Sequence, residues 1–336
     1  MKNTPNQDFL VVMGMIALLV IPAIFTLRTV EHPGMLIIPS CGPTAYAVDP
    51  DAAVPPTCNP TPLGYTWSLL IFLLPVMAIV WWFFHHPEYK IERKAFWLTI
   101  IFFSIAGAAL DMLLGNTFFY FPNEGAVIGI RLPGYEFGHG WVLDIPIEEF
   151  LFYFLGSLFM LLVYLWGDLY WFGAYNLDNY EEMTNGIDKI VKPQWHSVVI
   201  GLILVIAGYI YKKYGSHPYH EGFPAYFSVL VMTFVAATFV FFRTVKTFVN
   251  WRAYSLTLYS LLSVSLLWEA TLGVPYGWWK YHPEQMLGIF IGAWSHLPIE
   301  AVLLWFVAGW GVVMIFEVIR IYLHMDRSLR DAFFGL

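Results

Sequence analysis

Long apolar runs, separated by shorter polar stretches, dominate the pattern of residues along the chain. Eight of these runs are about 20 residues long, the length that an α-helix needs to cross the hydrocarbon core of a bilayer. They cover approximately Phe9–Leu27, Tyr65–Phe84, Ala95–Phe119, Trp141–Trp166, His196–Tyr211, Phe223–Phe242, Tyr254–Leu272 and Leu287–Phe316. The pattern predicts an all-α, polytopic membrane helix bundle of about eight transmembrane helices. The first run is expected to be retained, because no small-residue cleavage site of a signal peptide follows it.

One short element of the sequence occurs twice. Pro-Ile-Glu-Glu at 146–149 is followed, about 150 residues later, by Pro-Ile-Glu-Ala at 298–301. An acid that stands four residues before a glycine precedes each copy, Asp111 in the first and Glu269 in the second. This self-similarity indicates an internally duplicated membrane fold. With four helices in each copy, the two tandem repeats are expected to have the same, parallel orientation.

The duplication also predicts the division of the chain. The boundaries are a first repeat at 1–167, a polar linker at 168–195, a second repeat at 196–324 and a tail at 325–336.

The composition supports the prediction of a membrane protein, and the positions of Lys and Arg predict its orientation. Of the 336 residues, 59% are hydrophobic and only 12% are charged, which is typical of membrane proteins. When the eight spans alternate in direction, twelve of the 17 Lys and Arg residues fall on the side that carries both termini. The positive-inside rule makes that side cytoplasmic. We therefore expect a protein of the cell (inner) membrane, with the lipid bilayer as its partner and no nucleic acid.

Both cysteines of the chain, Cys41 and Cys58, lie in a proline-rich loop on the opposite side of the membrane. A disulfide between them is expected, because that compartment is oxidising. Two unpaired thiols remain the alternative, since the geometry of the loop is unknown.

Acidic residues stand inside the predicted spans, where each costs about 2.5–3.5 kcal/mol to insert. All of them fall in the outer half of the membrane, namely Asp111, Asp144, Glu148, Glu149, Glu269 and Glu300. Adjacent Glu148 and Glu149 cannot share one face of a helix, because successive residues are rotated by about 100°. The acids are expected to meet across a pseudo-twofold interface and to serve catalysis. A structural role, in which they bond to neighbouring helices, stays open.

Aromatic residues accompany these acids along the sequence. A carboxyl group in a dry pocket can act as a Brønsted acid, and a second, ionised carboxylate can act as a base. Aromatic faces stabilise cations in sites that lack water. Together with an apolar substrate, such groups indicate carbocation chemistry on a polyene. The expected substrate-binding residues are Trp268, Trp278, Trp279, Trp294, Phe118, Tyr120, Pro146 and Pro298.

The ordered set of acid, glycine, aromatic-rich outer loop and Pro-Ile-Glu-Glu segment, present twice in one chain, resembles the integral-membrane lycopene cyclase family. The resemblance covers mainly Ala95–Trp166 and Tyr254–Phe316. It implies an isomerase (an intramolecular lyase) that converts the acyclic ψ ends of lycopene to β-ionone rings without a cofactor. Association with other carotenoid-pathway enzymes is a further expectation. By position, the acid, the base and the groups that stabilise the cation would come from Glu148, Glu149, Glu300, Asp111 and Glu269.

The chain departs from this family pattern at two points. Ala301 replaces the second acid of the repeated motif, and each half has one helix more than the three-helix unit of the family. A cyclase or hydratase that acts on another carotenoid or terpenoid therefore remains an alternative. A proton-coupled transporter is the alternative from a different class, although few Ser, Thr, Asn or Gln residues stand near the acids.

Other signals exclude particular chemistries. No Gly-x-Gly-x-x-Gly motif joins a strand to a helix, which argues against a flavin-binding fold. The two histidine pairs, His85–His86 and His217/His220, do not make the many-histidine set of a di-iron site, so no metal site is expected.

The first testable prediction concerns orientation. A reporter fused after Leu336 should be active on the cytoplasmic side, and one inserted near Lys213 should be active on the outer side, because the Lys and Arg distribution sets the direction of the spans. A C-terminal reporter that is active only outside the cell would contradict the assignment.

Overall fold

The computed structural model describes residues 62–87, 91–177 and 179–336. Within these ranges, seven helices are long and apolar enough to cross a membrane, which makes the chain an integral membrane protein. They are α3 Gly64–His85, α4 Arg93–Phe118, α5 Glu148–Trp166, α7 Trp195–Tyr214, α8 Ala225–Val245, α9 Trp251–Trp268 and α10 Ile299–His324. The predicted span Phe9–Leu27 lies outside the described residues, as do Cys41 and Cys58.

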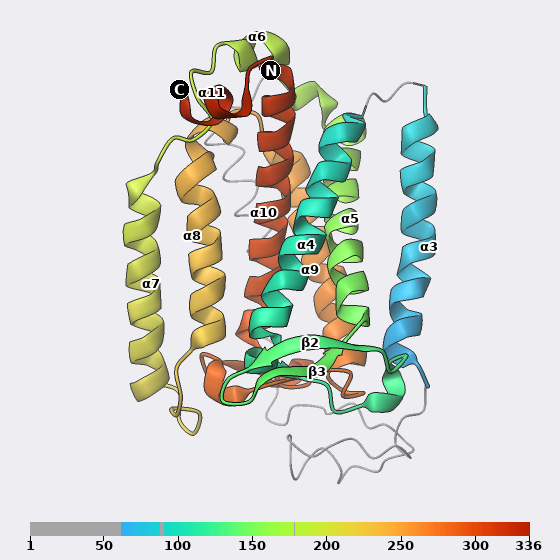
Figure 1. The fold of residues 1–336 in the computed structure, drawn as a ribbon, viewed down its shortest axis with the longest axis vertical. Helices are drawn as coiled ribbons and strands as arrows, with labels where there is room; N and C mark the ends of the chain where they lie inside the picture. Colours follow the sequence, from blue (N-terminus) through green and yellow to red (C-terminus); the bar gives the residue numbers. More distant parts are fainter. Residues whose placement is uncertain (1–61, 88–90, 178) are drawn as a thin grey trace.

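Shorter elements close the two ends of the bundle (Figure 1). The end drawn at the top carries two short helices, α6 Tyr180–Asn185 and α11 Leu329–Phe334. Two π-helical turns, Gly167–Trp171 and Glu269–Gly273, continue α5 and α9. Three small antiparallel sheets pair β1 Phe119–Tyr120 with β4 Lys280–Tyr281, β2 Arg131–Glu136 with β3 Gly140–Pro146, and β5 Phe290–Ile291 with β6 Leu297–Pro298.

Helix α10 is the centre of the bundle. It packs against α4, α5, α8 and α9, and 61% of its most apolar stretch is buried, compared with 17% for α7. Figure 1 shows α7 and α3 on opposite sides of the bundle. Helix α7 packs on α8, and α3 packs on α5. Because hydrocarbon solvates apolar side chains as well as a protein core does, the outer helices can stay apolar all round.

Two of the predicted spans were wrong at their boundaries. The span Trp141–Trp166 contains β3, so that α5 begins only at Glu148, and the span Leu287–Phe316 gives way to α10, which begins at Ile299 and continues to His324. In both places proline is the last residue of the preceding strand, Pro146 in β3 and Pro298 in β6. Proline cannot donate a hydrogen bond, and it disfavours helical backbone in the residue before it. The acids of both motifs therefore stand in the first turn of a helix.

Asp144 was predicted to stand within a spanning helix, but it lies in β3, before α5 begins. Its side chain is 54% exposed and lies 3.7 Å from Nη1 of Arg131 on the paired strand. An exposed ion pair of this kind contributes little to stability.

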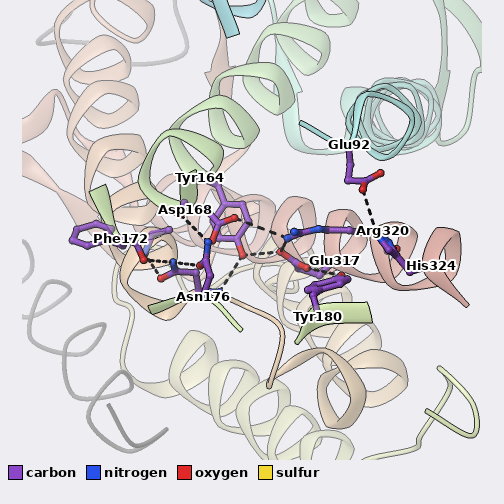
Figure 2. Close-up of polar contacts among 11 residues, drawn as sticks. Glu92, Tyr164, Asp168, Phe172, Asn176, Tyr180, Glu317, Arg320 and His324 are labelled. Carbon is purple, nitrogen blue, oxygen red and sulfur yellow. Dashed lines mark hydrogen bonds and ion pairs between the residues drawn. The ribbon is translucent and has the colours of Figure 1, made fainter. Parts of the chain in front are cut away.

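A buried polar network holds the end of the bundle opposite the motif acids (Figure 2). The hydroxyl of Tyr164 donates to Glu317, 2.9 Å away, and that of Tyr180 donates to the other carboxylate oxygen at 3.4 Å. Nη1 of Arg320 lies 3.7 Å from Glu317 and 3.9 Å from Asp168. The network joins α10 to the end of α5 and to the connecting segment that contains α6. The sequence analysis missed it, because the predicted spans ended before Asp168, Glu317 and Arg320.

This network generates a stability prediction. Arg320→Ala should lower the free energy of unfolding by about 3–5 kcal/mol, because two buried carboxylates would lose their shared cation. Thermal unfolding in detergent measures the effect. Arg330→Ala, at an exposed position, is the control and should change nothing. Equal unfolding temperatures for the two variants would show that Arg320 does not neutralise the pair.

Candidate functional site

Five of the predicted catalytic acids gather at one end of the bundle, and each is at most 9% exposed. They come from four elements: Asp111 from the end of α4, Glu148 and Glu149 from the first turn of α5, Glu269 from the π-helical turn after α9, and Glu300 from the first turn of α10. The structure thus brings together residues that lie up to 189 positions apart, from 111 to 300.

Glu149 faces an aromatic cluster. Its Oε1 accepts a 2.6 Å hydrogen bond from the hydroxyl of Tyr65, the second residue of α3. The Tyr65 ring stacks on Trp278 with centroids 5.8 Å apart, and lies 6.0 Å from Trp268 and 5.3 Å from Trp279. Three of the predicted substrate-binding tryptophans therefore surround the tyrosine that holds this acid.

Asp111 lies in the same buried cluster. The hydroxyl of Tyr153, one turn beyond Glu149 on α5, lies against its carboxylate. The second carboxylate oxygen, Oδ2, is buried and has no hydrogen-bond partner among the residues that the structure describes. Asp111 can therefore take up a proton or a further donor.

Glu269 is held by two aromatic donors. Nε1 of Trp305 donates to one carboxylate oxygen and the hydroxyl of Tyr281 donates to the other, 2.7 Å away. Burial, and next the charge of Glu269, raise the pKa of Tyr281 well above its ordinary value, so that the hydroxyl keeps its proton. The bond from the indole to a carboxylate increases the electron density of the Trp305 ring, which favours contact with a cation.

Glu148 and Glu300 have a different environment, because each binds the backbone of the loop before its helix. Glu148 Oε1 accepts from the backbone N–H of Ile128 at 2.7 Å and from the hydroxyl of Thr66 at 2.6 Å. Glu300 Oε1 accepts from the backbone N–H of Leu287 at 2.5 Å. Both carboxylates thus secure loops at this end of the bundle, and neither lines the apolar groove described next.

An apolar groove ends at the aromatic cluster. It lies between α3, α5 and α9, and its lining includes Phe72 and Val264, which are exposed on the surface of the bundle. Phe152, Trp268 and Trp305 line the end nearest the acids. The lining extends to Val76, Phe159 and Leu261, about two helical turns or ~10 Å further into the bundle. Ser265 is the single polar residue of this lining.

The remaining predicted binding residues stand apart from this cluster. Phe118 stacks on Tyr226, with centroids 4.8 Å apart, and Tyr120 lies 5.1 Å from the ring of His282. Trp294 packs on the main hydrophobic core from the turn before β6. Pro146 and Pro298 are buried at the ends of their strands.

Sequence reasoning missed several residues of the site, among them the aromatic residues Tyr65, Tyr153, Tyr281 and Trp305. Tyr65 is 84 positions away from Glu149, and no local pattern connects the two. A usable signal existed for Tyr153 and Trp305, which stand four and five residues after a motif acid and so one turn along the same helix. Within the described ranges, no group of three or more His, Cys, Asp and Glu side chains is arranged to hold a metal ion.

Gly115 and Gly273, which stand four residues after Asp111 and Glu269, each leave room for a close contact. A Cβ atom on Gly115 would lie 2.6 Å from Oδ1 of Asp111, and one on Gly273 would lie 2.3 Å from the ring of Trp279. The first glycine lets the acid fold back over its own helix, and the second lets the aromatic cluster close.

Gly273→Ala should therefore displace the Trp279 ring and destabilise the protein by about 1–3 kcal/mol, as overpacking of a core does. Thermal unfolding in detergent is the measurement. Gly156→Ala is the matched control, since its Cβ would be 3.7 Å from the nearest atom and alanine favours a helix. Unchanged stability of Gly273→Ala would mean that the ring does not approach this closely.

A comparison with known protein families gives one match, which lies in the C-terminal part of the bundle. Residues 224–319 match the family model described as Lycopene cyclase. The match includes α8, α9 and most of α10, and with them Glu269 and Glu300. Among curated proteins and solved structures, nothing matches the chain. Residues 224–319 therefore form a lycopene cyclase family domain, set in a polytopic membrane protein.

Proposed function

We propose that the protein is a carotenoid cyclase that converts the ψ ends of lycopene to β-ionone rings within the membrane. The lycopene cyclase domain implies a cyclase, and its membrane helices imply a carotenoid that reaches the site from the bilayer. The observation that carries the proposal is the position of Glu149. This acid and its partner Tyr65 lie behind an aromatic wall at the inner end of a groove that an apolar polyene can enter.

The proposed reaction moves protons and leaves the atom count unchanged. An acid protonates the terminal double bond and forms a tertiary cation. The electrons of the internal double bond then form the ring bond, which moves the cation onto a ring carbon. A base removes a neighbouring proton and restores a double bond. The faces of Trp268, Trp305 and Phe152 at the end of the groove are suited to stabilising both cations.

We assign the proton transfers to Glu149 together with Asp111. Glu149 has no acidic counterpart in the second motif, where Ala301 takes its place. Asp111 is the acid that shares Tyr153 with it, and Oδ2 of Asp111 has no hydrogen bond, as is also true of Oε2 of Glu148 and Glu300. Glu269 is proposed to act on the cation through Trp305, whose indole it polarises. Glu148 and Glu300 are proposed to position the site, because each binds loop backbone through Oε1.

The repeated motif supports a duplicated architecture. We propose that α3, α4 and α5 correspond to α8, α9 and α10, and that α7 is an additional helix. Two kinds of helix contact support this correspondence. The α4–α5 contact in the first half matches the α9–α10 contact in the second, and the α5–α9 contact matches the α10–α4 contact. The segments that follow α4 and α9 pair with each other as β1 and β4. By the charge distribution, the end that carries the acids is proposed to face away from the cytoplasm.

The proposal predicts that Glu149→Gln loses about 10²–10⁴-fold in rate, as is typical when a general acid or base is removed. The amide preserves the shape of the side chain and can still accept the bond from Tyr65, so the protein should fold. The measurement is the amount of cyclised, hydrated and unreacted pigment in a lycopene-accumulating host.

Glu181→Gln makes the same chemical change at an exposed position and should leave the conversion unaffected. Immunoblots of the membrane fraction confirm equal abundance. Full activity of Glu149→Gln would remove the assignment of this residue. Lycopene left unreacted by the wild type would contradict the proposed substrate.

A further inference from the structure

We infer that the chain has a single working site for ring formation, so that the two ends of a polyene enter the same groove in turn. The monocyclic product must then leave the groove before the second ring forms. This inference rests on the cyclase activity proposed above, and it comes from the difference between the groove and the corresponding place in the other half of the bundle.

The two places can be compared residue by residue. Glu148 and Glu300 each stand in the first turn of a helix and accept a bond from a loop N–H. Tyr65 and Tyr226 are each the second residue of a helix, α3 and α8. The groove between α3, α5 and α9 therefore corresponds to the contact between α8, α10 and α4.

The second place lacks the acid. Glu149 corresponds to Ala301, which is fully buried and offers no oxygen to Tyr226. The Tyr226 ring packs instead on Phe118, with centroids 4.8 Å apart, and edge-on against Phe119 at 5.2 Å. In the first half, Glu149 accepts a bond from the tyrosine hydroxyl, whereas the second half has no carboxylate at the equivalent position.

The second place is also lined differently. Phe159, which lines the groove on α5, corresponds to Gly311 on α10. A Cβ atom on Gly311 would lie 3.1 Å from the ring of Phe103 on α4, so glycine lets this ring come close to α10 where the first half has a groove-lining side chain.

A single site has a kinetic consequence. Lycopene has two equivalent ends, and only one of them can reach Glu149 at a time. After the first ring forms, the pigment must leave the groove and return with its other end first. While lycopene is abundant it competes for the groove, so the monocyclic pigment accumulates before the bicyclic one.

The test uses purified, full-length protein in lipid nanodiscs with excess lycopene, and follows the pigments by chromatography over time. For the wild type, the monocyclic pigment should be the main product at first, with bicyclic pigment following as lycopene is depleted. Glu149→Gln should lose both products together. Gly156→Leu, which fills the groove, should do the same. Ala308→Leu, at the corresponding position of α10, should convert lycopene as the wild type does.

Bicyclic product formed from the start without free monocyclic pigment would overturn the inference. So would Glu149→Gln that still forms one ring per molecule, because a second site would then be working. Either result would leave the proposed cyclase activity intact. A wild type that converts no lycopene would overturn the proposed function, and the inference with it.

Discussion

Burying carboxylates inside a bundle of lipid-exposed helices is possible only when each of them has a polar partner. This constraint accounts for much of the molecule. Glu148, Glu149, Glu269 and Glu300 accept hydrogen bonds from donors in other segments, such as Tyr65 for Glu149 and Ile128 for Glu148. The need to satisfy the acids therefore fixes how α3 and the loops at this end of the bundle sit against α5 and α10. The network around Arg320 meets the same need at the opposite end.

The acids differ in the kind of partner that they bind. Glu148 and Glu300 each hold a loop through a backbone N–H that bonds to Oε1, while Oε2 of both residues has no hydrogen-bond partner among the described residues. An aromatic hydroxyl or an indole joins the carboxylate to a ring, and the ring can contact a substrate. Glu149 and Glu269 are connected in this way to the wall of the groove through Tyr65 and Trp305. The apolar groove can then bring a polyene end to the rings while the charge stays behind them.

The sequence predicted the described spans well, because the bilayer demands long apolar helices and leaves little ambiguity. It also led to the prediction that Trp268, Trp278 and Trp279 lie near the acids, and the structure places them around Tyr65, the partner of Glu149. It failed where the apolar run around Leu143 continued through a strand, since short apolar runs do not distinguish a strand from a helix. It could not show which groups hold Glu148 and Glu149, because their partners Thr66 and Tyr65 are more than 80 positions away. The two-repeat division of the chain stays a prediction.

The most direct test of the account is a structure of the Glu149→Gln variant in nanodiscs with lycopene bound, because this variant should hold the substrate without converting it. The account predicts a polyene in the groove between α3, α5 and α9, with one ψ end against Trp268 and Trp305 and within reach of residue 149. A polyene bound between α4, α8 and α10, or on the outer surface of the bundle away from the acids, would contradict it.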